Sequence, residues 1–352
     1  MKRSAFLIAI VVLIAFTYVN ISTAQSPVQK ASPGIRPETT FIAEPITLET
    51  PTGTLYGTLE RPQSRLALPV VLIIAGSGPT DRDGNSPILK GPNNSLKLLA
   101  AGLAAQGIAS VRYDKRGIGE TGKAMQLAAE KAKTPLREED LRFEPFIDDA
   151  VRWGKKLRAD RRFSTLTIIG HSEGSLIGMV AAQRMGANAF VSIAGAGRPM
   201  QEIILEQFKS QLTPDLLKTT EHILSQLTAG KTVESVPNEL NMLFRPSVQP
   251  YLISWLRYDP SKDIGKLAIP VLIVQGTTDL QTRPADAKRL AAGNAGAQLL
   301  LIDGMNHVLK TVPNEQDKQI SSYSDPTLPV ATDLISAISK FVNEIRNHTA
   351  GQ

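Results

Sequence analysis

Cysteine is absent from the 352 residues of this chain, and several kinds of chemistry are absent with it. Without a thiol the protein can form no disulfide, no thiolate metal site and no cysteine nucleophile, and lipoprotein processing is excluded. Only four histidines are present, which leaves few candidates for a general base. Low-complexity tracts are also missing, and 42% hydrophobic with 20% charged residues is typical of a globular protein. The chain must therefore be stabilised by its core, and it is long enough to bury one.

The positive charge of the chain is weak and scattered. The net charge is +6, and removal of an N-terminal segment that holds Lys2 and Arg3 leaves +4. No basic run is interleaved with aromatic residues. Nucleic acid is therefore not an expected partner.

Residues 1–24 have the pattern of a secretory signal peptide. Lys2 and Arg3 form a short positive region, Ala5–Val19 is apolar, and Ser22-Thr23-Ala24 is a small-x-small cleavage pattern. The apolar stretch is short for a membrane span, which needs about 20 residues. We expect cleavage after Ala24, a periplasmic or secreted protein and no stable membrane insertion after cleavage. An uncleaved N-terminal anchor is the alternative.

After a Pro- and Ser-rich linker at residues 25–40, short apolar runs alternate with helical patterns. The runs with strand character are Phe41–Leu48, Thr54–Glu60, Val70–Ala75, Ile108–Tyr113, Leu166–Ile169, Phe190–Ala194, Val271–Gln275 and Leu299–Ile302. The helical patterns are Ser95–Gln106, Phe146–Leu157, Leu176–Met185, Ala285–Ala292 and Ala331–Ile345. The first two strands are separated by the turn Pro51-Thr52-Gly53, which predicts a hairpin at the sheet's leading edge. The alternation predicts an α/β fold, with a mostly parallel sheet covered by helices on both faces.

Two stretches interrupt this alternation. Residues 120–145 are highly charged, and residues 197–262 are helical without a buried-strand pattern. Strand patterns resume after each, so both are expected to be insertions, the longer one a helical cap over the site. The predicted division is core at 41–196, cap at 197–262 and core again at 263–352.

The strongest motif is Gly170-His171-Ser172-Glu173-Gly174, which fits G-x-S-x-G. It follows a predicted strand and precedes a predicted helix, as a nucleophile elbow requires. Glycines at both ends let the strand and helix backbones approach, and the sharp turn exposes the serine hydroxyl. Ser172 is therefore the predicted nucleophile; an ordinary structural serine in a βα turn is the plainer alternative.

The base and the acid follow from chain order, which is Ser, then acid, then His in this kind of hydrolase. His307 comes just after the last predicted strand, whereas the other histidines lie beside the nucleophile, in the cap or near the C-terminus. Asp279 follows the preceding strand and would hold the imidazole in the right tautomer and stabilise the imidazolium. The rival acid is Asp303, expected instead to form a turn at a strand end.

The oxyanion donors are predicted to be the backbone N–H groups of Ser77 and Glu173. Ala75-Gly76-Ser77-Gly78-Pro79 follows the first buried strand, where glycines let the backbone approach a substrate. Gly78 is an alternative to Ser77, and a simple turn is the alternative to both.

Two other motifs suggest ligands but lack essential residues. Asp81-Arg82-Asp83-Gly84-Asn85 resembles a calcium loop, but its glycine comes one position early and no glutamate closes it. We expect these side chains to tie the loop to its neighbours by hydrogen bonds. Gly117–Lys123 matches G-x-G-x-x-G and nearly a P-loop, but Ala124 replaces the residue that would hold magnesium. No cofactor and no metal is therefore expected.

A resemblance to a known family is carried by Gly76-Ser77-Gly78-Pro79 with Asp81–Asn85, Tyr113-Asp114-Lys115-Arg116-Gly117, the Gly170–Gly174 elbow and Gly276-Thr277-Thr278-Asp279. On these motifs the chain resembles bacterial α/β-hydrolases of the serine aminopeptidase (S33-type) and dienelactone hydrolase-like group. Within the group it looks most like exported esterases. The resemblance covers residues 45 to 345 and implies an α/β-hydrolase fold with Ser172, Asp279 and His307 as a triad. Ala75 departs from many relatives, in which histidine precedes the oxyanion glycine.

The predicted function is hydrolysis of small-molecule esters through an acyl-enzyme. An aminopeptidase on the same triad is the first alternative, and it would need a cap carboxylate such as Glu202, Glu206 or Glu221 to bind a free amine. A non-catalytic binding module is the second. We also predict an ion pair between Arg116 and Glu173 that orders the elbow.

Overall fold

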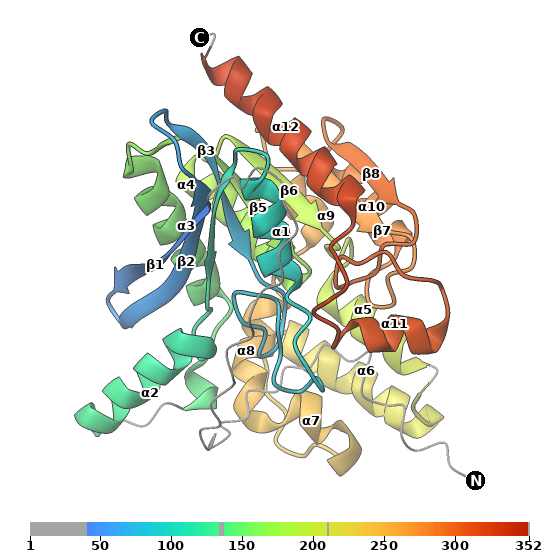
Figure 1. Ribbon diagram of the computed structural model, residues 1–352. Coiled ribbons are helices and arrows are strands. Elements are labelled where there is room, and N and C mark those ends of the chain that lie inside the picture. Colours follow the sequence, from blue (N-terminus) through green and yellow to red (C-terminus); the bar gives the residue numbers. More distant parts are fainter. Residues whose placement is uncertain (1–40, 134–136, 210, 351–352) are drawn as a thin grey trace.

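The computed structural model describes residues 41–133, 137–209 and 211–350 (Figure 1). The predicted signal peptide at 1–24 and linker at 25–40 lie outside the described residues. Across the ranges that are described, we find no helix both long and apolar enough to cross a bilayer.

Eight strands of the described ranges form one sheet. They are β1 (Phe41–Thr50), β2 (Gly53–Pro62), β3 (Leu68–Ile74), β4 (Ala109–Tyr113), β5 (Phe163–His171), β6 (Ala189–Ile193), β7 (Val271–Gly276) and β8 (Gln298–Ile302). Their order is β1-β2-β4-β3-β5-β6-β7-β8. Strand β2 is antiparallel to both its neighbours, and every pairing from β4 onward is parallel. The predicted eight-stranded, mostly parallel sheet is confirmed.

Burial along the strands explains why their sequences differ. β1 alternates exposed and half-buried residues because it lies at the edge of the sheet. β7 is buried at every position, as helices cover both faces of the sheet there. The predicted hairpin joins β1 to β2, where Thr50 Oγ1 donates to the Gly53 carbonyl at 2.6 Å.

Helices cover both faces of the sheet. The helices α1 (Ser95–Ala104) and α12 (Thr332–Ala350) pack on one face through residues such as Leu99 and Leu334 (Figure 1). The other face is covered by α3 (Glu144–Ala159), α4 (Glu173–Met185) and α10 (Pro284–Gly293). The sheet separates the two hydrophobic clusters that result. Packing on both faces holds the strands in place, and with them the strand ends that carry the site.

Between β6 and β7 the described chain is helical. The helices are α5 (Met200–Lys209), α6 (Pro214–Thr228), α7 (Asn241–Phe244), α8 (Gln249–Trp255) and α9 (Pro260–Ile264). Figure 1 shows α5 to α8 gathered at one end of the sheet. Leu227, Phe244 and Leu252 are fully buried and join the cluster formed by α3 and α4. This segment therefore packs against the core, where a cap was expected.

Two helices were not anticipated from the sequence, α2 (Gly119–Ala132) and α11 (Gln316–Ser322). Thr121 is the one buried residue of α2; its hydroxyl donates to the Asp114 carbonyl and accepts from the Tyr56 N–H. A helix anchored in this way carries no apolar stripe, so the first part of the charged stretch at 120–145 gave no helical pattern.

Candidate active site

Ser172 lies in the sharp turn between β5 and α4, as predicted. Its backbone has φ 56° and ψ −121°, a strained conformation for a residue with a side chain. A Cβ at Gly170 would lie 2.2 Å from the Gly174 carbonyl oxygen, and one at Gly174 would lie 2.3 Å from that of Ile74. Both positions therefore require glycine, because strand and helix approach too closely for any side chain.

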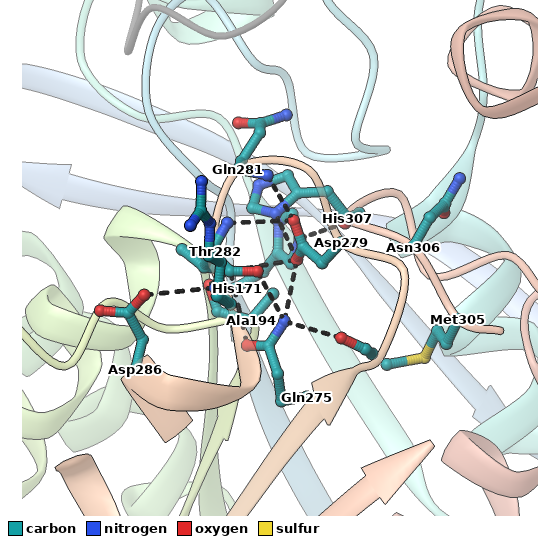
Figure 2. Close-up of polar contacts among 12 residues, drawn as sticks. His171, Ala194, Gln275, Asp279, Gln281, Thr282, Asp286, Met305, Asn306 and His307 are labelled. Carbon is teal, nitrogen blue, oxygen red and sulfur yellow. Dashed lines mark hydrogen bonds and ion pairs between the residues drawn. The ribbon is translucent and has the colours of Figure 1, made fainter. Parts of the chain in front are cut away.

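Asp279 and His307 are brought together by the loops that follow β7 and β8. Asp279 Oδ2 lies 2.8 Å from His307 Nδ1, and both side chains are buried (Figure 2). The other predicted acid, Asp303, accepts from Thr277 Oγ1 at 2.9 Å and is not the partner of His307. Nδ1 of His307 is thus occupied by Asp279, and among the described residues no hydrogen bond joins His307 to Ser172.

Four further donors surround the Asp279 carboxylate. Oδ1 accepts from the backbone N–H groups of Gln281, at 2.7 Å, and Thr282, at 3.0 Å. Oδ2 accepts from Gln275 Nε2 at 3.1 Å and lies 3.0 Å from Thr282 Oγ1 (Figure 2). Burial alone would raise the pKa of Asp279, but the charge and hydrogen bond of His307 and the backbone donors outweigh it and lower the pKa below its ordinary value. Asp279 is therefore ionised at neutral pH.

His171 is buried beside His307. Its Nε2 lies 2.8 Å from the His307 carbonyl oxygen, and the two ring centroids are 4.9 Å apart. Burial, together with the neighbouring His307, lowers the pKa of His171 to about 3. His171 is therefore neutral, with Nε2–H donating. His222 and His348 are exposed on α6 and α12.

A pocket opens beside Ser172, at the helical segment of residues 197–262. It is lined by Ser77, Ser172, Glu173, Leu176, Ala196, Arg198, Met200, Ile203, Gln207, Trp255, Tyr258, Pro260, Gln281 and Thr282. The predicted oxyanion residues Ser77 and Glu173 both line this pocket. The part of its wall that comes from residues 197–262 is mainly apolar and aromatic.

The predicted ion pair between Arg116 and Glu173 is wrong. Arg116 instead binds Asp149 with two hydrogen bonds, Nε to Oδ2 at 2.5 Å and Nη2 to Oδ1 at 2.6 Å. Its neighbour Lys115 is the partner of Glu173, with Nζ 2.9 Å from Oε1. Successive residues of this loop face opposite ways, so the basic side chain that reaches the elbow comes one position earlier.

The loop at 81–85 uses its side chains for its own structure. Asp81 Oδ1 accepts from the N–H groups of Asp83 and Asn85, each at 2.9 Å. Arg82 pairs with Asp114 at 2.8 Å, and Asp83 with Arg112 at 3.2 Å. The expectation that hydrogen bonds tie this loop to its neighbours is confirmed. Among the described residues, no group of three or more His, Cys, Asp or Glu is placed to hold a metal ion.

Sequence comparison places this chain among hydrolases. The family described as serine aminopeptidase, S33, matches residues 94–316. A curated relative, esterase EstD of Thermotoga maritima, is 29% identical over 273 residues, which cover 75% of this chain. The chain spans 61% of the length of that relative.

Solved structures of low identity show the fold. Est1E of Butyrivibrio proteoclasticus, solved with ferulic acid bound, is 16% identical with a TM-score of 0.53, and the match covers 87% of this chain and 100% of that one. A puromycin-hydrolyzing peptidase of Mycobacterium tuberculosis is also 16% identical with a TM-score of 0.53, over 86% of this chain and 39% of that one. The α/β-hydrolase fold is thus common to esterases and peptidases.

Proposed function

Because the chain belongs to the serine aminopeptidase S33 family and is a hydrolase of the α/β-hydrolase fold, we propose that it is a carboxylesterase that cleaves small or medium esters. Two observations support this proposal: the buried hydrogen bond between Asp279 and His307, and the strained turn that places Ser172 at the wall of a pocket. These are the three groups that acyl transfer by a serine needs.

In the proposed mechanism His307 Nε2 takes the proton of Ser172 Oγ as the oxygen attacks the ester carbonyl. Asp279 holds the ring tautomer and stabilises the imidazolium. The N–H groups of Ser77 and Glu173 bind the oxyanion of the tetrahedral intermediate. The imidazolium then protonates the departing alcohol, and a water, deprotonated by the same imidazole, releases the acid from the acyl-enzyme.

The ion pairs of the cap favour an ester over a peptide with a free amine. Glu202 pairs with Arg289 at 3.2 Å, and Glu206 pairs with Arg198. Glu221 is exposed on α6 and does not line the pocket. None of the three cap carboxylates is thus an unpaired group facing the pocket.

The charges of the pocket wall point the same way. Glu173 is the one carboxylate among the described lining residues, and Lys115 neutralises it. Arg198 is the one lining cation, and it is paired with Glu206 and, at 2.9 Å, with Asp286, so each charged residue of the described lining has a partner of opposite charge. An uncharged ester therefore fits this pocket better than an N-terminal amino acid, and we assign residues 197–262 as the cap that shapes the acyl site.

The test is the turnover of a p-nitrophenyl ester series and of amino-acid p-nitroanilides. It compares the wild-type protein with the variants Ser172→Ala and Ser336→Ala. Ser336 is exposed on α12, so its variant is the matched control. We expect ester turnover that is lost in Ser172→Ala and kept in Ser336→Ala. Turnover of anilides alone would replace the esterase with an aminopeptidase. Failure to turn over either substrate or to react with a fluorophosphonate probe would favour a binding module.

Export is also part of the proposal. Its support is the charge, apolar and small-residue pattern of residues 1–24. N-terminal sequencing of the protein recovered from the periplasm or medium should begin at Gln25. Full-length protein in the membrane fraction would instead indicate an uncleaved anchor.

A further inference from the structure

Lys115 connects two segments of the candidate site that are far apart in sequence. Its Nζ donates to the Gly76 carbonyl oxygen at 2.5 Å and to Glu173 Oε1 at 2.9 Å. The side chains of Lys115 and Glu173 are only 4% and 5% exposed. Nζ also lies 5.7 Å from the centroid of the Phe146 ring. A buried ammonium with these contacts is held in one place.

The contact with Gly76 has a consequence for Ser77. The two residues share one peptide group, and no peptide bond of the described chain is cis. In a planar trans peptide the C=O and the N–H point in opposite directions. An ammonium that fixes the Gly76 carbonyl therefore also fixes the direction of the Ser77 N–H. Polarisation of the same peptide by the charge makes that N–H a stronger donor.

The contact with Glu173 acts on the other donor. Glu173 is the first residue of α4, and its N–H is one of the unpaired groups at the helix N-terminus. Its carboxylate also accepts from Tyr251 Oη of α8, at 3.3 Å. Lys115 thus neutralises a carboxylate that would otherwise repel an oxyanion, and the cap contacts the same group.

We propose that Lys115 is a positioning residue that orients and polarises the Ser77 N–H through the Gly76 carbonyl and so sets the strength of the oxyanion hole. This inference rests on the proposed acyl-transfer function. A simpler role, as the counter-charge of Glu173, predicts a different result when both charges are removed together.

The experiment compares Lys115→Met with the double variant Lys115→Met/Glu173→Gln. Lys340→Met, at an exposed position on α12, is the matched control. We expect kcat for a p-nitrophenyl ester to fall about a hundredfold in Lys115→Met, the loss typical of a missing oxyanion donor, with KM changed less than about threefold. The double variant should keep this loss, because the Gly76 carbonyl still lacks its donor. The Ki of a trifluoromethyl ketone, whose adduct carries an oxyanion, should rise by the same factor.

A double variant with kcat within about threefold of wild type would overturn the inference and leave Lys115 as a counter-charge only. Since that variant contains no unpaired buried charge, it remains a valid test if Lys115→Met does not fold. Wild-type protein without ester turnover, or turnover that survives Ser172→Ala, would overturn the proposed function itself and the inference with it. That result is visible before any Lys115 variant is measured.

Discussion

His171 Nε2 donates a hydrogen bond to the backbone carbonyl of His307, so the residue before the predicted nucleophile holds the loop of the predicted base. The bond joins the end of β5 to the loop after β8, which lie at different positions in the sheet. Nε2 carries a hydrogen in both the neutral and the protonated ring, so it is burial rather than this bond that keeps His171 neutral. The pH dependence of stability follows from this burial.

We predict that His171 makes the protein lose stability on acidification. Burial lowers the pKa of His171 to about 3, against 6.5 for the free side chain, so between these values the unfolded chain binds a proton that the folded chain does not. The contribution of neutral His171 to the unfolding free energy is fully present above pH 6.5 and is lost progressively as the pH falls toward 3. Between pH 7 and 4.5 this amounts to roughly 2–3 kcal/mol of unfolding free energy.

The measurement is urea unfolding at the two pH values for the wild type, His171→Gln and His222→Gln. The glutamine at 171 keeps an N–H donor but does not titrate. The difference in unfolding free energy between the two pH values should therefore be smaller in this variant by the contribution of His171. His222→Gln, at an exposed position on α6, should keep the wild-type difference. If His171→Gln loses as much unfolding free energy between the two pH values as the wild type does, the prediction is contradicted.

Asp279 and Asp303 can be distinguished by the same substitution. Asp279→Asn should lower kcat by about 10⁴-fold, because an amide no longer selects the tautomer with a proton on His307 Nδ1. Asp303→Asn should remain within about threefold of wild type, since its carboxylate accepts from Thr277 rather than from His307. Steady-state kinetics on one ester decides the matter, and a large loss in Asp303→Asn would reverse the assignment.

Arg116 should matter for stability and not for turnover. Asp149 is 1% exposed, and Arg116→Ala would leave its carboxylate buried beside only the weaker contact with Arg152, at 3.5 Å. We expect a loss of about 3–5 kcal/mol in unfolding free energy, with kcat within threefold of wild type. In Arg116→Met/Asp149→Leu much of the stability should return. A hundredfold loss of kcat in a folded Arg116→Ala would contradict a role in stability alone.

The sequence predicted those parts of the fold that depend on runs of apolar residues. β3, β6 and β7 are buried almost throughout, and each was located from a continuous apolar run. The exposed edge strands β1 and β8 were also located, each from a run with strand character. Helix α2 was missed because one buried threonine anchors it and no apolar stripe exists. Local burial patterns therefore predict elements that pack broadly and miss those held by a few polar contacts.

The candidate site was predictable where backbone geometry constrains the sequence. The elbow needs glycine at 170 and 174, and that requirement is visible in the sequence. The donors around Asp279 and the choice of Lys115 over Arg116 were not visible. Both depend on the direction in which adjacent loop side chains point, and that direction is set by tertiary packing. Polar contacts between loops produce no sequence periodicity from which they could be predicted.

Trp255 offers the last prediction, because it lines the pocket and belongs to the same hydrophobic cluster as Phe143. It lines the pocket, is 2% exposed and stacks on Phe143, with ring centroids 5.6 Å apart and planes 6° from parallel. Trp255→Leu should make room for longer acyl chains, each added methylene raising kcat/KM by about fourfold until the space is filled. The chain-length optimum of the p-nitrophenyl ester series measures this.

Trp153 is the other tryptophan of the chain and provides the control. It is fully buried in the core against Tyr113 and does not line the pocket. Trp153→Leu should therefore lower the melting temperature while keeping the wild-type chain-length optimum. If both variants shift the optimum alike, the pocket responds to loss of core packing in general and Trp255 does not set acyl length. If only Trp255→Leu shifts the optimum, Trp255 in the pocket wall determines which acyl-chain length the enzyme prefers.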